Sequence, residues 1–276
     1  MMLAQLNPKL DMGDMNKIRV AVLLLPGDLS STWRDLPQGL TVMAATEFFV
    51  TTIVGEALAF EPDRWVFIGP PQWSEDQDPQ FEAIRVQDIA RALAFAADAP
   101  WPTIIIDASS VPETGGAPLN ALSALIEGRV GAAVVDETVF PSMLAFYHKR
   151  RISEDVEISS HLLRFADSSA DQGRIDLTGP ARVLAWGPHL ALSRGRWRLR
   201  LRFRIDEDAA GTDFRIEWGS LMTSSLLNAA CESPGVYLAE IEHEWSAVDA
   251  CEARLILTHP AFVGEFVLEG MWIGRA

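Results

Sequence analysis

The sequence contains little cysteine and little lysine, and it has fewer basic than acidic residues. Only two of its 276 residues are cysteines, Cys231 and Cys251. Two cysteines cannot frame a disulfide-stabilised fold or hold zinc by themselves. We expect both to be buried free thiols, with a single bridge between them as the alternative. The length and the 49% hydrophobic fraction suit a globular chain with room for two cores.

Basic residues are scarce relative to acidic ones. Lys and Arg number 23 against 38 Asp and Glu, which gives a formal net charge of −15. Residues 1–151 and the remainder carry 19 acids each, so neither half is a basic domain. An acidic surface repels phosphate backbones and anionic lipids. The composition therefore predicts no nucleic-acid partner and no binding to anionic membranes.

Long apolar runs are missing as well. The first residues, Met1 to Asp14, are mixed and polar where a signal peptide needs an apolar core. The longest apolar stretch, residues 42–60, is interrupted by Glu47 and Glu56, which are costly in a bilayer. We expect a flexible leader over residues 1–16, no signal peptide, no membrane insertion, and a cytoplasmic or particle-associated protein.

Catalytic and cofactor motifs do not occur. The sequence has no G-x-G-x-x-G, no G-x-x-x-x-G-K-[ST], no G-x-S-x-G and no H-E-x-x-H. Its five histidines are too widely spaced to suggest a metal site. We therefore predict no cofactor and no metal, and we favour binding over enzymatic chemistry.

In the first half, short apolar runs alternate with helical patterns. The runs cover residues 18–25, 65–68, 103–106 and 132–135, and they lack period-two alternation. Such runs are typical of strands buried on both faces of a parallel sheet. Helical spacing is found over residues 42–60, 86–97, 119–126 and 139–151. This order predicts an α/β (Rossmann-like) domain over residues 17–152, with a small, parallel, doubly wound sheet.

In the second half, strict alternation replaces the helical patterns. Residues 196–205 place an arginine at every second position, with Trp197, Leu199 and Leu201 among the residues between them. Period two indicates a strand with one buried and one solvated face. Several later segments show the same pattern, separated by turn signals. We predict an antiparallel jelly-roll β-sandwich over residues 153–276.

Charge complementarity predicts one strand pairing. Like charges on adjacent strands destabilise a sheet, so the arginine face needs an acidic neighbour. Glu240, Glu242 and Glu244 share its period of two. We therefore expect these two strands to be adjacent.

One motif resembles a known family. It consists of Trp186-Gly187-Pro188-His189, a turn at Ser193-Arg194-Gly195, and the strand start Arg196-Trp197-Arg198-Leu199. It resembles the jelly-roll domains attached to bacterial glycosyltransferases and polysaccharide-handling proteins, which are similar to carbohydrate-binding β-sandwiches. The resemblance covers roughly His161 to Ile273. It implies that the second half is a sandwich whose partner is a glycan.

The candidate glycan-binding residues are aromatic or lie in predicted turns. An indole ring covers the apolar face of a pyranose. Trp186 lies in a Gly-Pro turn and Trp73 lies in a polar, proline-flanked segment, so both are candidates for exposure. His189 and His259 stand beside prolines in predicted turns. The alternative for each tryptophan is a structural role in the core.

A second candidate site lies in the first half. Asp28, Asp107 and Asp136 each follow an apolar run. Carboxyl ends of parallel strands meet at one edge of a sheet, so the three carboxylates could share a rim. Such a cluster could hold a divalent ion or perform acid–base work. The alternative is that they are ordinary cap and loop residues.

Two functional hypotheses follow. In the first, the protein is a non-catalytic carbohydrate-binding or attachment protein, for example a spike or fibre component of a phage-like particle. Its sandwich then grips a glycan, and its α/β domain docks to a protein partner or to further copies of the chain. In the second, it is an enzyme or accessory subunit of polysaccharide biosynthesis that works at the aspartate rim. A groove with converging carboxylates there favours the second hypothesis.

Overall fold

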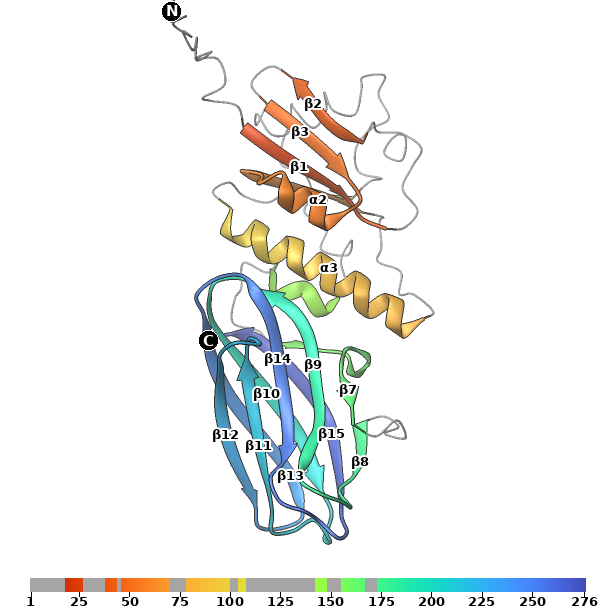
Figure 1. Ribbon diagram of the computed structural model, residues 1–276, viewed down its shortest axis with the longest axis vertical. Coiled ribbons are helices and arrows are strands. Elements are labelled where there is room, and N and C mark those ends of the chain that lie inside the picture. The colour runs from red at the N-terminus through yellow and green to blue at the C-terminus, as the bar shows by residue number, and fades with distance from the viewer. Residues whose placement is uncertain are drawn as a thin grey trace, which may run out of the picture.

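The computed structural model describes residues 18–26, 38–43, 46–69, 78–99, 104–107, 142–147, 155–166 and 173–276. These residues form three β-sheets (Figure 1). One is the N-terminal sheet. The other two face each other as a sandwich, and we name them after central strands as the β10 sheet and the β14 sheet. Helix α3 (Pro79–Asp98) lies between the N-terminal sheet and the sandwich.

The N-terminal sheet is mainly parallel. Its order is β2-β3-β1-β4-β5, and β3, β1, β4 and β5 run parallel while β2 pairs antiparallel at the edge. The strands are β1 (Ile18–Leu24), β2 (Gly39–Met43), β3 (Thr46–Thr51), β4 (Arg64–Gly69) and β5 (Ile104–Asp107). Strands were predicted from three of the apolar runs, at residues 18–25, 65–68 and 103–106, and this prediction is confirmed.

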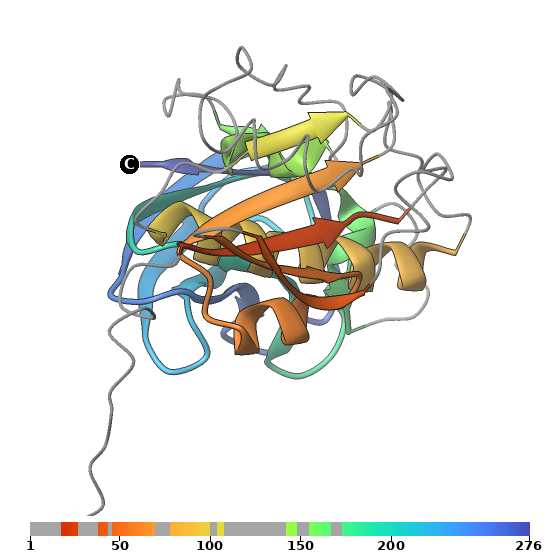
Figure 2. The ribbon, with the colours of Figure 1, turned by 90° about the horizontal axis from the view of Figure 1, so that it is seen from above.

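Both faces of this sheet are buried. Val20 and Val22 point to one face and Ala21 and Leu23 to the other, and all four are at most 1% exposed. This explains why the run shows no alternation. Helices α2 (Val54–Ala59) and α3 both lie on the face toward the sandwich (Figures 1 and 2). Since the described helices cover one face, the doubly wound arrangement stays a prediction.

The helix predicted over residues 42–60 is wrong over most of its length. Among the described residues of this segment, 42–43 and 46–51 belong to β2 and β3, and Val54–Ala59 is the helical part. Phe48 and Val50 pair in register with Val20 and Val22 of β1. Aromatic and β-branched residues fit such a pleated surface, and the pairing outweighs the helical spacing. The predicted segments 119–126 and 132–135 lie outside the described residues.

Helix α3 is longer than its apolar stripe indicated. It begins at Pro79, and the side chain of Asp78 accepts a hydrogen bond from the Gln80 N–H at 2.8 Å. A capping carboxylate followed by proline is a favourable helix start. The predicted segment 86–97 lies within it. Of the segment 139–151, predicted as a helix, the described residues form a short 3₁₀ helix, η2 (Ser142–Tyr147).

The second half forms the predicted antiparallel sandwich. The β10 sheet contains β13 (Gly235–Trp245), β10 (Gly195–Ile205), β15 (Glu265–Arg275), β6 (Val156–Glu157) and β8 (Arg174–Asp176). The β14 sheet contains β12 (Ser224–Cys231), β11 (Thr212–Gly219), β14 (Asp249–Leu257), β9 (Arg182–Leu192) and β7 (Arg164–Phe165). A 3₁₀ turn, η3 (Ser160–Leu162), precedes β7. From β9 onward the chain crosses between the sheets at each connection except the β11–β12 hairpin.

The predicted pairing of the arginine and glutamate strands is confirmed. Strands β10 and β13 are antiparallel neighbours, and Arg200 lies opposite Glu240 with 2.6 Å between Nε and Oε2. Asp155, which the sequence did not indicate, bridges Arg198 and Arg200. The alternate residues Trp197 and Leu199, together with Leu201, are buried. The arginine face is thus compensated by acids and offers no open anion-binding surface among these pairs.

The core is continuous between the N-terminal sheet and the sandwich. One cluster of buried residues includes Leu23, Phe67, Ile89 and Leu190. Gln87 of α3 donates a hydrogen bond from Nε2 to the carbonyl of Pro188 in β9 at 2.9 Å. The domain boundaries predicted at residues 17 and 153 stay predictions.

Both cysteines are free and buried, as expected. Burial raises the pKa of Cys231 to about 11 and also raises that of Cys251. At pH 8 a thiol with such a pKa is a thiolate in about one molecule in a thousand. We therefore expect no alkylation of the native protein by iodoacetamide at pH 8, and alkylation of both thiols in urea, measured by mass spectrometry. Rapid labelling of the native protein would contradict this burial.

Candidate functional site

The structure places only some of the predicted site residues. Trp73, Asp28 and Asp136 lie outside the described residues. Asp107 is the last residue of β5 and is paired with Gly69 of β4, so its backbone lies at the carboxyl edge of the N-terminal sheet. The shared aspartate rim is thus neither assembled nor excluded by the described residues.

Trp186 and His189 lie inside a strand rather than in the predicted turn. Both belong to β9, and the register with β14 shifts between Pro188 and Ala191 of that strand. Gly187 has φ +132° and His189 has φ +59°, and the Gly187–Pro188 peptide bond is cis. The turn prediction was wrong because pairing with β14 includes Trp186, Gly187 and Pro188 and resumes at Ala191.

His259 lies away from Trp186. It follows the end of β14 and is exposed, with Asp213 4.0 Å from its ring nitrogen. Trp186 lies opposite Arg254 of β14. At about 3.3 Å per residue, the five residues from Arg254 to His259 span about 16 Å. His259 therefore belongs to the far end of the sandwich and not to a site around Trp186.

Trp186 is part of a row of side chains that crosses the whole β14 sheet. Residues directly opposite one another in an antiparallel pair point to the same face. The register gives the Trp186 row, which runs across β7, β9, β14, β11 and β12 as Arg164, Trp186, Arg254, Glu217 and Leu226. The adjacent residues Leu255 and Ile216 point into the core. The Trp186 row therefore lies on the outer face of the sheet.

Ion pairs hold two guanidinium groups of this face, those of Arg254 and Arg215, in place. Arg254 contacts Glu252 through Nη2 at 2.5 Å and Glu217 through Nη1 at 3.6 Å. Arg215 contacts Glu217 at 3.0 Å. The hydrogen bond to Glu252 raises the pKa of Arg254. A guanidinium has five donors, so these paired groups keep donors for a ligand while their orientation is fixed.

A second row extends the outer face beside the first. The register aligns Val183 with Ile256, Ile256 with Arg215 and Arg215 with Asn228. The side chains near β9 are apolar and half-buried, whereas Asn228 on β12 is exposed. Together the two rows combine an apolar patch around Trp186 with guanidinium, carboxylate and amide groups.

His189 marks the end of this face next to α3. It is half-buried, and desolvation lowers its pKa, while the charge of Glu252 acts in the opposite direction. A lowered pKa leaves the imidazole neutral near pH 7, so it can both donate and accept a hydrogen bond. The hydrogen bond from Gln87 to Pro188 places α3 beside it.

Sequence reasoning missed most of the polar members of this site. Arg164, Arg254 and Glu217 come from three strands that are distant in sequence from Trp186. The available signal was that Arg254 and Glu217 occupy solvated positions of alternating segments. That signal identifies a face but not which strands are neighbours.

Similarity to known proteins is limited to structure. No family model matches the chain, and a search of curated proteins gave no match. The carbohydrate-binding module TmCBM61, solved in complex with β-1,4-galactotriose, is similar at 6% identity and TM-score 0.31, covering 45% of this chain and 88% of that one. The xylan-binding module CBM15 is similar at 8% identity and TM-score 0.33, covering 45% and 97%. Both are carbohydrate-binding modules, the class that the sequence resembles.

A third similar structure spans nearly the whole chain. It is the glycosylation-associated Gap123 protein complex from Streptococcus agalactiae, at 10% identity and TM-score 0.32. The match covers 94% of this chain and 50% of that chain.

The described residues contain neither a membrane-spanning helix nor a metal-binding cluster. Among them, no helix is long and apolar enough to cross a membrane. Nor do the described parts of the chain bring together three His, Cys, Asp or Glu side chains in an arrangement suited to a metal ion.

Proposed function

We propose that the protein is a non-catalytic carbohydrate-binding protein and that the outer face of the β14 sheet holds the glycan. The observation that supports this is the position of Trp186. Its indole is partly exposed on the face of an antiparallel sandwich, with a guanidinium group on the strand at each side, Arg164 and Arg254.

The chemistry of this face matches that of a sugar. A pyranose has an apolar C–H face and a rim of hydroxyl groups. Trp186 and Ile256 offer apolar surface to the first, while Arg164, Glu217 and Asn228 offer donors and acceptors to the second. Binding of this kind requires no nucleophile and no cofactor.

The dimensions and charge of the face narrow the ligand class. The Trp186 row crosses five strands, which span about 19 Å at ~4.8 Å between neighbours. That width suits an oligosaccharide or a polysaccharide segment better than one sugar. Two of the three arginines of the face, Arg215 and Arg254, are compensated by Glu217 and Glu252. We therefore propose a neutral glycan.

Trp186→Ala tests this proposal. We expect the full chain to bind neutral oligosaccharides on a glycan array, and the variant to bind about 10- to 100-fold more weakly, because it loses the stacking surface. Calorimetric titration with the best array ligand gives the ratio.

Trp272→Ala is the matched control. Trp272 is also half-buried, but it lies on the β10 sheet between Arg200 and Glu157. Its removal is expected to leave the glycan affinity unchanged. The site is misplaced if Trp272→Ala abolishes binding while Trp186→Ala does not, and the function is wrong if the folded wild-type chain binds no glycan.

We further propose that the N-terminal layer is doubly wound and that it docks the sandwich to a protein partner or to another copy, as in an attachment protein of a particle. The packing of α3 and η2 on the sandwich supports this, because it holds the glycan face in a fixed relation to that layer.

A role in polysaccharide biosynthesis, performed by the N-terminal layer, is the second candidate function. It is favoured by the cleft at the carboxyl edge of the N-terminal sheet.

A further inference from the structure

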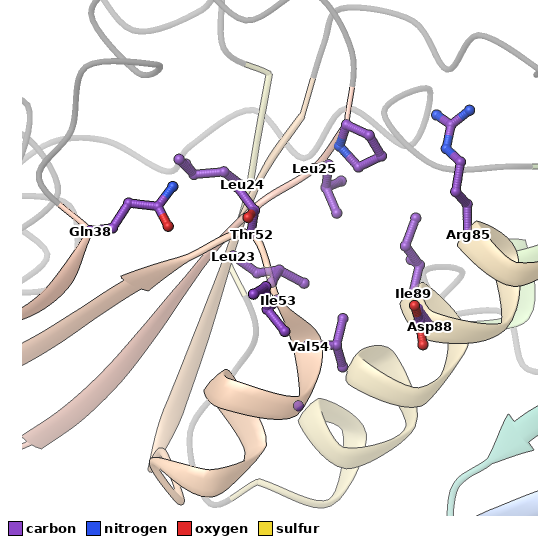
Figure 3. A pocket seen from close by; sticks show the side chains of 12 residues that line it. Leu23, Leu24, Leu25, Gln38, Thr52, Ile53, Val54, Arg85, Asp88 and Ile89 are labelled. Carbon is purple, nitrogen blue, oxygen red and sulfur yellow. The ribbon is translucent and has the colours of Figure 1, made fainter.

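A cleft of about 630 Å³ opens at the carboxyl edge of the N-terminal sheet (Figure 3). It lies between the ends of β1 and β3 on one side and helix α3 on the other. In α/β proteins, ligands bind outside the carboxyl ends of parallel strands. Its lining includes the apolar residues Ile53 and Ile89, the polar residues Gln38 and Thr52, and the charged residues Arg85 and Asp88.

The floor of the cleft is apolar. Figure 3 shows Leu23, Ile53 and Val54 between the sheet and α3, with Ile89 facing them from the helix. Ile53 is 54% exposed, although it is a large hydrophobic residue. A cleft of this volume with an apolar floor and a few polar groups at its margin has the usual character of a small-molecule site.

Helix α3 contributes two charged side chains to the cleft, Arg85 and Asp88, and only Arg85 has an ion-pair partner among the described residues. Arg85 contacts Glu82 with 3.3 Å between Nη1 and Oε2, and the Glu82 side chain is only 3% exposed. The buried carboxylate compensates the charge of Arg85, whose guanidinium extends away from Asp88 in Figure 3. Asp88 is exposed, and among the residues that the structure describes none forms an ion pair with it.

We propose that this cleft binds a small organic amine with an apolar body. The ammonium group lies against Asp88, and the apolar body covers Ile53 and Ile89. Gln38 and Thr52 provide an amide and a hydroxyl on the opposite side for a polar substituent. The net charge of −15 adds a longer-range attraction for cations, which salt screens.

A preference for positively charged over neutral and negatively charged ligands is the expected property of this cleft. A solvent-exposed ion pair contributes at most about 1 kcal/mol, which is about a fivefold change in affinity. The amine is therefore expected to bind about two- to fivefold more tightly than a neutral molecule of the same shape, and a carboxylate more weakly than both.

Three probes of nearly equal shape provide the test: 3-methylbutylamine, 3-methylbutanol and 3-methylbutanoate. Each is titrated into the ¹⁵N-labelled full chain, and chemical-shift changes of the backbone amides give affinity and location. We expect shifts at residues 52–55 and 85–89, with the amine binding most tightly at low salt.

Asp88→Asn is expected to remove the preference for the amine while the alcohol binds as before. The matched control is Asp98→Asn, the same charge change at the end of α3 and outside the cleft. Ile53→Ala is expected to weaken the binding of the amine and of the alcohol to the same extent.

The inference is overturned if the three probes bind equally, if no probe shifts the cleft residues, or if Asp88→Asn keeps the preference for the amine. These outcomes are independent of the glycan proposal, because Trp186→Ala leaves the cleft unchanged.

Discussion

Replacing Trp197 by alanine is expected to lower the free energy of unfolding by about 3–5 kcal/mol. The side chain is fully buried. Its ring lies 5.3 Å from that of Phe146 and 6.2 Å from that of Tyr147, and the Arg275 guanidinium lies 4.1 Å from its centroid. Nε1 donates to the carbonyl of Ser193 at 2.8 Å. The substitution therefore creates a cavity where η2 meets the sandwich and removes the hydrogen bond to the carbonyl of the buried Ser193.

Urea denaturation followed by circular dichroism measures this loss. Trp197→Phe keeps most of the ring area but removes the donor, so we expect a smaller loss, about 1–3 kcal/mol. Trp272→Ala on the same sheet removes a half-buried ring and should cost less than Trp197→Ala. A loss below about 1 kcal/mol for Trp197→Ala would mean that this residue is not packed as described.

Gly187→Ala is expected to lower the free energy of unfolding by about 2–5 kcal/mol and to weaken glycan binding. Gly187 has φ +132°, which side chains rarely adopt, and an added Cβ would lie 2.6 Å from the carbonyl oxygen of Leu162. Either the chain at η3 or the strand β9 must then shift. Because Trp186 is the adjacent residue, the glycan face is disturbed as well.

Gly235→Ala separates the two causes. Gly235 has a similar φ of +145°, but nothing lies within 4 Å of an added Cβ. We expect a smaller loss of stability from backbone strain alone, about 1–2 kcal/mol, and no change in glycan affinity. Equal losses for the two variants would show that the contact with Leu162 contributes nothing.

The fold of the second half could be predicted further than that of the first. Period two in Arg196–Ile205 identified β10 and its buried face, and the charges of Glu240 and Glu242 identified its neighbour. For β10, the local alternation of residues and the charges of the neighbouring strand indicate the same structure. In residues 42–60 the spacing of apolar residues favoured a helix, but Phe48 and Val50 are held in β3 by parallel pairing with β1. Pairing between strands that are distant in sequence cannot be recognised from the local spacing of apolar residues.

The candidate site was predictable only in part. The motif around Trp186 pointed to strand β9 and to the aromatic residue around which the glycan site is proposed. The neighbours Arg164, Arg254 and Glu217 are supplied by the order of strands in the β14 sheet, which non-consecutive pairing determines. At the carboxyl edge of the N-terminal sheet, the cleft has Asp88 of α3 in its wall, which sequence reasoning did not indicate. Two of the predicted strand-end aspartates, Asp28 and Asp136, lie outside the described residues.

The most direct test of the glycan face is the indole region of a ¹H–¹⁵N NMR spectrum recorded during titration with the best array glycan. Signals are assigned from the Trp186→Ala and Trp272→Ala variants. We predict that the Nε1–H signal of Trp186 shifts progressively and saturates with the glycan, while that of Trp272 stays in place. A titration in which Trp186 is unaffected while glycan binds would contradict the proposal.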